Sequence, residues 1–208
     1  MTCPFCANKK VTKRGYSTKE ASTQMAELSS QFTSISPGMD TETATDDLVS
    51  TMQAFGIATE EVERKVMDNI NAIGNSMATT NAEIGEMLKR SSAAMKAANN
   101  SLEQTIALES AAVQITRNAE TTGTAFRTIS MRIRGYSEES EDGLEEVDEE
   151  LKNISGDIAD LTKINGKGGI SIFTDETRSE YKSTYQILKE ISEIYDQLTD
   201  AQQANETA

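Results

Sequence analysis

The chain has 208 residues, a formal net charge of −14 and a hydrophobic content of only 37%. Its length fits one or two ordinary domains, and its low aromatic content of 5%, with no tryptophan, favours helices with small side chains over a β-rich fold. The strong negative charge disfavours nucleic acid or an anionic membrane as the main partner. Because the sequence contains no histidine, it excludes Ser-His, Cys-His and His-metal mechanisms.

No apolar run approaches the ~20 residues that a membrane-spanning helix needs. No signal-peptide pattern follows Met1. We therefore expect a soluble chain that is synthesised in the cytoplasm.

Residues 1–16 differ from the rest because they are basic and contain both cysteines. Cys3 and Cys6 have the spacing of one zinc knuckle, and the segment looks like the first half of a small zinc ribbon. A structural zinc needs four ligands, and the sequence offers no second pair. We interpret this segment as a mobile tail without retained chemistry. Metal or disulfide pairing between molecules and a dithiol redox site are the alternatives.

From residue 17 the pattern becomes helical. Ser17 with Glu20 and Thr80 with Glu83 have capping-box spacing, and helices are expected over about 43–55, from 59 to 74, and from 80 onwards. The stripes expected to be buried are Ala21, Met25, Leu28; Ala44, Leu48, Met52, Phe55; Val62, Val66, Ile70, Ile73; Ile84, Met87, Leu88 and Met95. The short Gly/Asn turns between them predict antiparallel neighbours.

Residues 101–135 predict a two-helix hairpin at the centre of the helical domain. Ser101 and Gln104 form a further capping-box pair, and a turn is expected around Thr121–Gly123. Apolar residues on two faces predict that the first helix is buried among neighbours: Leu102, Ile106, Val113, and Leu108, Ala112, Ile115, Ala119. The second helix is expected to direct inward Phe126, Ile129 and Ile133, to expose Arg127, Arg132 and Arg134, and to stop at Gly135.

Residues 136–150 form a strongly acidic run. It lacks a calcium-binding loop pattern, so we interpret it as a solvated linker rather than a metal site. It follows the arginine-rich helix directly and is expected to lie near it, although exposed ion pairs contribute only ~0.2–1 kcal/mol each.

The glycine-rich segment 165–169 does not have the spacing of a phosphate-binding loop, despite Lys167. The alternation of Ile170 and Ile172 predicts a short extended clip over the helices. Thr177 and Glu180 are expected to cap a last amphipathic helix. Its predicted stripe is Tyr181, Tyr185, Leu188, Ile191, Tyr195 and Leu198.

The predicted fold is therefore all-α: an antiparallel array of short helices with a long C-terminal amphipathic helix and a short extended Gly-rich clip. Three regions are expected. They are a basic CxxC head over 1–16, a helical core over 17–135, and an acidic linker, clip and C-terminal helix over 136–208.

The run LEQTIALESAAVQITRNAETTGTAFRTISMRIRG resembles the core region of phage tail tape measure proteins of the type found in prophages of Gram-positive bacteria. Phe126-Arg127 stands where family members often have Leu-Lys, which keeps an apolar residue beside a cation. Further segments match, so the resemblance covers about residues 17–204: SISPGMDTETATDDLVSTMQAFGI, INAIGNSMATTNAEIGEMLKRSSAAMKAANNSLEQTIAL and GISIFTDETRSEYKSTYQILKEISEIYDQLTDAQQA.

The resemblance implies a structural protein that templates tail tube assembly and sets tail length. It implies contacts with the tail tube (major tail) protein, tail assembly chaperones and distal tail or baseplate proteins, with possible self-association. It also implies a location in the host cytoplasm during assembly and in the virion tail lumen afterwards. No catalytic, cofactor-binding or metal-binding residue is expected.

Proteins of this family are several times longer, so we expect the chain to be a truncated or split piece. As one helix it would span roughly 310 Å, too short for a long tail. The alternative is a bacterial helical interaction protein or a secreted coiled coil, but Gly/Asn breaks at 56, 74, 99–100 and 135 interrupt any long heptad seam. An enzyme such as a peptidoglycan hydrolase is disfavoured because no catalytic constellation is present.

Overall fold

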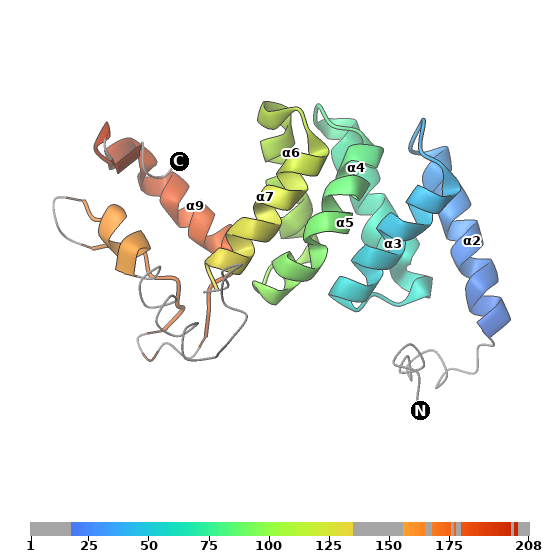
Figure 1. The fold of residues 1–208 in the computed structure, drawn as a ribbon, viewed down its shortest axis with the longest axis horizontal. Coiled ribbons are helices and arrows are strands. Elements are labelled where there is room, and N and C mark those ends of the chain that lie inside the picture. The colour runs from blue at the N-terminus through green and yellow to red at the C-terminus, as the bar shows by residue number, and fades with distance from the viewer. Residues whose placement is uncertain are drawn as a thin grey trace.

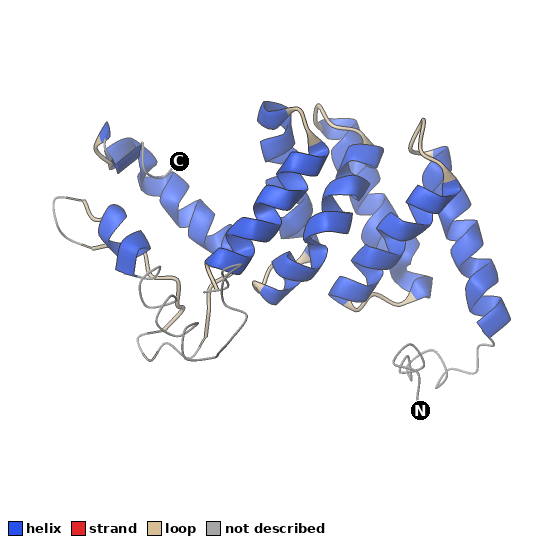
Figure 2. Cartoon of the chain, viewed as in Figure 1, coloured by secondary structure: helices blue, strands red, loops and turns tan. Residues whose placement is uncertain are grey.

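The computed structural model describes residues 18–134, 156–164, 168–175, 177, 180–200 and 202–203. These residues form helices and no strand, which confirms the all-α prediction (Figure 2). The α-helices are α2 (Thr18–Ser34), α3 (Thr41–Phe55), α4 (Asp68–Ser76), α5 (Asn81–Ala97), α6 (Leu102–Thr116), α7 (Ala119–Arg132) and α9 (Thr184–Ile194). The 3-10 helices η2 (Thr59–Glu61) and η4 (Tyr195–Gln197) and the π-helix η3 (Glu63–Met67) are also present, and residues 156–161 are helical.

The helices follow one another along the long axis of the molecule, from α2 at one end to α9 at the other (Figure 1). Three helical hairpins make up most of the row: α2 with α3, α4 with α5, and α6 with α7. Helix α5 lies at the centre, because it packs against α3 on one side and α7 on the other and also contacts α4 and α6. The predicted centre was the α6–α7 hairpin, which instead lies beside α5.

Side-chain caps determine where several helices begin. Asp40 accepts a hydrogen bond from the backbone N–H of Thr43 at 2.8 Å, and Asn118 accepts one from Thr121 at the start of α7. The boxes predicted at Thr80 and Ser101 are both present, each with its reciprocal hydrogen bond. The local sequence is therefore sufficient to start α5 and α6.

Two glycines allow the central helices to approach closely. Gly85 and Gly123 each stand five residues after the N-cap residue of their own helix, Thr80 and Asn118. A Cβ at position 85 would lie 2.6 Å from Asp47 Oδ2, and one at position 123 would lie 2.8 Å from the carbonyl oxygen of Met87. Glycine thus permits a close contact twice along the row: with the Asp47 side chain of α3 at position 85, and between the backbones of α5 and α7 at position 123.

The buried apolar residues form two clusters. The larger one joins α2 to α6 and contains Leu28, Phe32, Ala44, Leu48, Val62, Val66, Met67, Ile70, Ile84, Met87, Leu88, Leu102, Ile106 and Val113. This confirms most of the predicted stripes. The smaller cluster lies where α7 meets the C-terminal segments and contains Ile133, Ile172, Phe173 and Ile187, with Ile158, Tyr181 and Ile191 packed against it.

The predicted turn around Thr121–Gly123 is wrong. The chain turns at Arg117, which has a left-handed φ of 54°, and at Asn118, so that Thr121, Thr122 and Gly123 belong to α7. Gly123 serves the close approach to α5 rather than a turn.

Two side chains predicted to face inward are exposed instead: Ile115 by 87% and Ile129 by 39%. Helix α6 therefore buries one face, not two. Ala119, placed on that second face by the prediction, is the first residue of α7.

The start of the last helix was also predicted wrongly. Helix α9 begins at Thr184, where Ser183 and Gln186 form a capping box, and not after Thr177. Tyr181 lies in extended chain, where it forms an isolated antiparallel bridge with Phe173. The predicted clip is therefore paired, through Phe173, with the extended segment around Tyr181. The C-terminal helix α9 is shorter than expected, with 11 residues.

Replacing Gly123 by alanine should destabilise the array, because its Cβ would press on the backbone of Met87, which cannot rotate away. We expect a loss of about 1–3 kcal/mol in the free energy of unfolding, measured by urea titration. Gly156→Ala is the control, since no atom lies within 4 Å of the added Cβ there. An equal effect of both substitutions would contradict the packing described.

Candidate functional site

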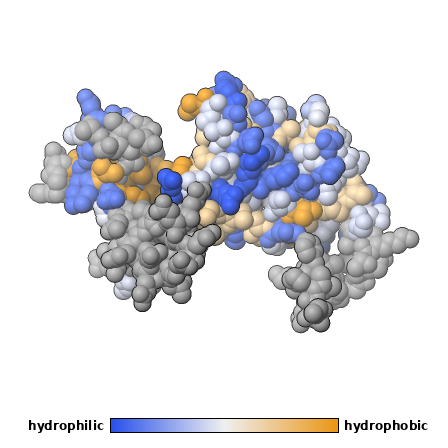
Figure 3. Space-filling view, viewed as in Figure 1, coloured by the Kyte–Doolittle hydropathy of each residue, from blue (hydrophilic) through white to orange (hydrophobic). Residues whose placement is uncertain are grey.

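The described residues contain no group of three or more Asp, Glu, His or Cys side chains that could hold a metal ion. None of the helices among them is long and apolar enough to cross a membrane. Cys3, Cys6, Lys167 and the acidic run 136–150 lie outside the described residues. Hydrophilic side chains cover much of the face over α5 and α7, and hydrophobic ones gather beside α9 (Figure 3).

The C-terminal segment is attached to the core through two asparagines in the turn between α5 and α6. Asn100 is only 1% exposed, and its amide nitrogen donates to the carbonyl oxygens of Met95 and Ala98. Its amide oxygen accepts from the backbone N–H of Tyr185 at 2.9 Å, in the first turn of α9. Asn99 donates to the carbonyl oxygen of Tyr181, also at 2.9 Å.

Helix α7 holds the same segment from its own end. The Arg134 guanidinium lies 4.2 Å from the centre of the Tyr181 ring and donates to the carbonyl oxygen of Lys182 at 3.1 Å. Ser130 Oγ and Thr184 Oγ1 are 3.1 Å apart. We call Asn99, Asn100, Ser130 and Arg134, together with residues 181–185, the C-terminal junction.

The three predicted arginines therefore have different environments. Arg127 and Arg132 are exposed, as expected, whereas Arg134 is half-buried in the C-terminal junction. Burial lowers the pKa of its guanidinium from the ordinary value, and the group remains a cation at any physiological pH.

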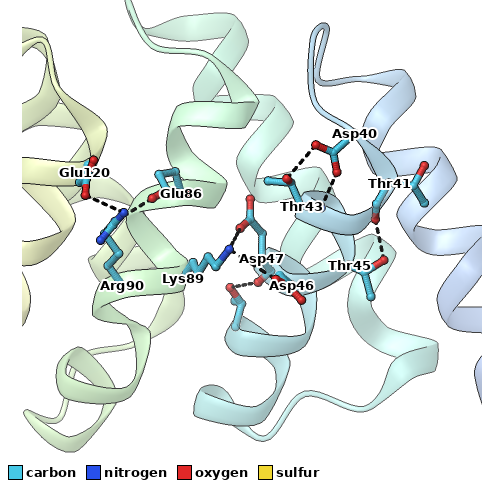
Figure 4. Close-up of polar contacts among 11 residues, drawn as sticks. Asp40, Thr41, Thr43, Thr45, Asp46, Asp47, Glu86, Lys89, Arg90 and Glu120 are labelled. Atoms are coloured by element: carbon cyan, nitrogen blue, oxygen red, sulfur yellow. Dashed lines mark hydrogen bonds and ion pairs between the residues drawn. The ribbon is translucent and has the colours of Figure 1, made fainter.

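A second group of polar residues surrounds α5 (Figure 4). Asp47 on α3 is 1% exposed, and neither of its carboxyl oxygens has a hydrogen-bond partner. Lys89 Nζ on α5 lies 4.0 Å from Asp47 Oδ1 and 3.6 Å from Asp46 Oδ2, so one cation serves two carboxyls. Burial raises the pKa of Asp47 to about 7, although Lys89 opposes the shift.

Glu109 on α6 is buried even more completely, with no exposed surface and no hydrogen-bond partner for either oxygen. Burial raises the pKa of Glu109 to about 8, and the nearby Ser91 hydroxyl on α5 lowers it only in part. On the surface, Arg90 on α5 pairs with Glu86 at 2.7 Å and with Glu120 on α7 at 2.9 Å. These exposed pairs contribute little, whereas the buried carboxyls impose a cost when they ionise.

The sequence analysis missed both buried carboxyls, although a signal was present. Glu109 stands between Ile106 and Val113 on the buried face of α6, and Asp47 adjoins Leu48 on that of α3. A carboxyl within an apolar helical stripe is uncommon unless it is paired or neutral.

The fold and these contacts define an all-α protein whose described polar residues mainly join helices to one another. A family model described as phage-related minor tail protein matches residues 7–208, and the chain belongs to this family. No curated protein matches the chain. No solved structure matches it either. The family favours a structural role in a phage tail over a bacterial interaction protein, and its match begins ahead of the predicted limit at residue 17.

Replacing Asn100 by alanine should weaken the attachment of α9, because the backbone N–H of Tyr185 would lose its acceptor. We expect a loss of about 1–3 kcal/mol in the free energy of unfolding and faster proteolysis of residues 180–200. Asn75→Ala, which removes only an exposed contact with Asn71, is the control. Unchanged proteolysis of the 180–200 region would refute the role of Asn100.

The two buried carboxyls should make stability depend on pH. Since their folded-state pKa values, about 7 and about 8, exceed the ordinary values of 3.8 and 4.5, their contribution is complete below about pH 4 and is lost as the pH rises through 7 and 8. The free energy of unfolding of Glu109→Gln, relative to that of the native chain, should therefore rise by at least ~1 kcal/mol when the pH is raised from 5 to 8.5. Urea titrations at the two pH values measure this difference. A difference between the two proteins that does not change with pH would contradict this assignment.

Proposed function

We propose that this chain is part of a tape measure protein, which templates assembly of the tail tube and sets tail length. Membership of the phage-related minor tail family over residues 7–208 carries the proposal. The resemblance of residues 17–204 to tape measure core regions supports the more specific function, that of a tape measure protein among tail proteins.

The architecture suits such a role. The helices occur in chain order along one axis, and most contacts join neighbours in the row. Such a chain can become extended when consecutive hairpins separate from one another, because no segment has to pass through another. In extended helical form each residue adds 1.5 Å, so that the number of residues translates into length.

The proposed partners follow from this role. The apolar stripes that bury against one another in the array would face the lumen of the tail tube, or the tail assembly chaperones before the tube forms. Distal tail or baseplate proteins would hold one end. The role requires no enzymatic activity, and we propose that the chain has none.

Tail length should change with the number of residues. An in-frame duplication of residues 18–134 in the phage that encodes this chain should lengthen the tails by about 175 Å, at 1.5 Å per added residue. Electron microscopy of negatively stained particles measures this directly. Asn75→Ala, which changes neither the number of residues nor the C-terminal junction, is the control and should leave tail length unaltered. Tails of native length in the duplication strain would overturn the proposal.

A further inference from the structure

Two buried carboxyls lie against the same helix from two neighbours. Asp47 reaches α5 from α3 and lies against Gly85, where the absence of a side chain leaves room for the carboxyl. Glu109 reaches α5 from α6, near Ser91. All four carboxyl oxygens lack hydrogen-bond partners, in a protein where such groups are normally satisfied.

The charged groups around Asp47 are almost all negative. Lys89 on α5 is the cation near it, and it is shared with Asp46. Glu86 on α5 and Asp46 and Asp40 on α3 each disfavour a second negative charge at this position. Helix α2 places the apolar ring of Phe32 beside Gly85. An ionised Asp47 would thus be incompletely neutralised.

Glu109 has no counter-ion among the described residues. The packed neighbours of α6 are α5, α7, α4 and α9, and no charged side chain on them perturbs Glu109; the group that acts on it is the Ser91 hydroxyl. An ionised Glu109 would need hydration, and its side chain has no exposed surface in the array. The free-energy cost of burying an unpaired carboxylate disappears when the helices that bury it separate.

We propose that loss of the Asp47 and Glu109 protons separates α5 from α3 and α6 and frees the hairpins to extend. We call α5 together with these two carboxyls the wedge. The wedge rests on the tape measure function proposed above and gives it a means of regulation. The compact array is the form with both carboxyls neutral, and the extended ruler is the form in which water or a partner surface reaches them. Helix α7 stays with α5, since their backbones meet at Gly123.

Hydrogen exchange of the full chain, followed by mass spectrometry at pH 6 and pH 8.5, tests the wedge. After correction for the intrinsic pH dependence of exchange, protection of α5 (Asn81–Ala97) should fall at least tenfold at the higher pH, since one proton released per opening gives up to a tenfold change per pH unit. In the Asp47→Asn, Glu109→Gln double variant the protection should stay nearly constant. Glu42→Gln and Glu103→Gln, at exposed positions on the same two helices, should behave as the native chain does.

Constant protection of α5 in the native chain would overturn the wedge, and this measurement needs no variant to fold. An equal loss in the double variant, or an equal loss of protection across α2 and α9, would overturn it as well, because the opening would then not depend on these carboxyls or on α5. The result is independent of tail length: a protein with a working wedge that fails to lengthen tails would refute the ruler alone.

Discussion

The close packing around α5 is the constraint on which the rest of the structure depends. The backbone of α7 reaches α5 only because residue 123 has no side chain, and the carboxyl of Asp47 fits against α5 only because residue 85 has none. These contacts set the spacing of α3, α5 and α7. The first helices of the hairpins, including α4 and α6, then bury Ile70, Ile106 and their neighbours behind that layer.

The C-terminal segments are held by a different kind of interaction. Their attachment uses side chains that bind backbone groups, as Asn100 binds Tyr185 and Arg134 binds Lys182, instead of a continuous apolar stripe. Around this junction only a small apolar cluster forms, with Ile172 and Ile187 at its centre. The array thus has one large apolar core and a smaller apolar cluster at the C-terminal segments.

Much of the fold could be predicted from the sequence because it is encoded locally. Capping boxes at Thr80 and Ser101 and the stripes of Leu48, Ile70 and Ile84 depend on residues three and four apart. The errors have non-local causes. Ile115 looks as buried as Ile106 by periodicity, but none of the described helices covers its side chain.

The start of α9 shows the same limit. Thr177 and Glu180 have the same capping-box spacing as Ser183 and Gln186. The helix nevertheless starts only at the second pair, because residues 181 and 182 are held in extended chain by contacts with Phe173, Asn99 and Arg134. The buried carboxyls were missed although Glu109 falls at helical spacing between Ile106 and Val113, and which neighbour each carboxyl meets depends on the tertiary packing. No sequence pattern specifies that Glu109 faces Ser91.

The central claim is that these helices become an extended ruler inside a phage tail. Lysine cross-linking of finished tails, analysed by mass spectrometry, tests it most directly, because the described lysines include Lys65 on η3 and Lys189 on α9. The account predicts cross-links to the tail tube protein from lysines throughout this range. Cross-links confined to proteins of the tail tip, or an absence of the chain from finished tails, would contradict it.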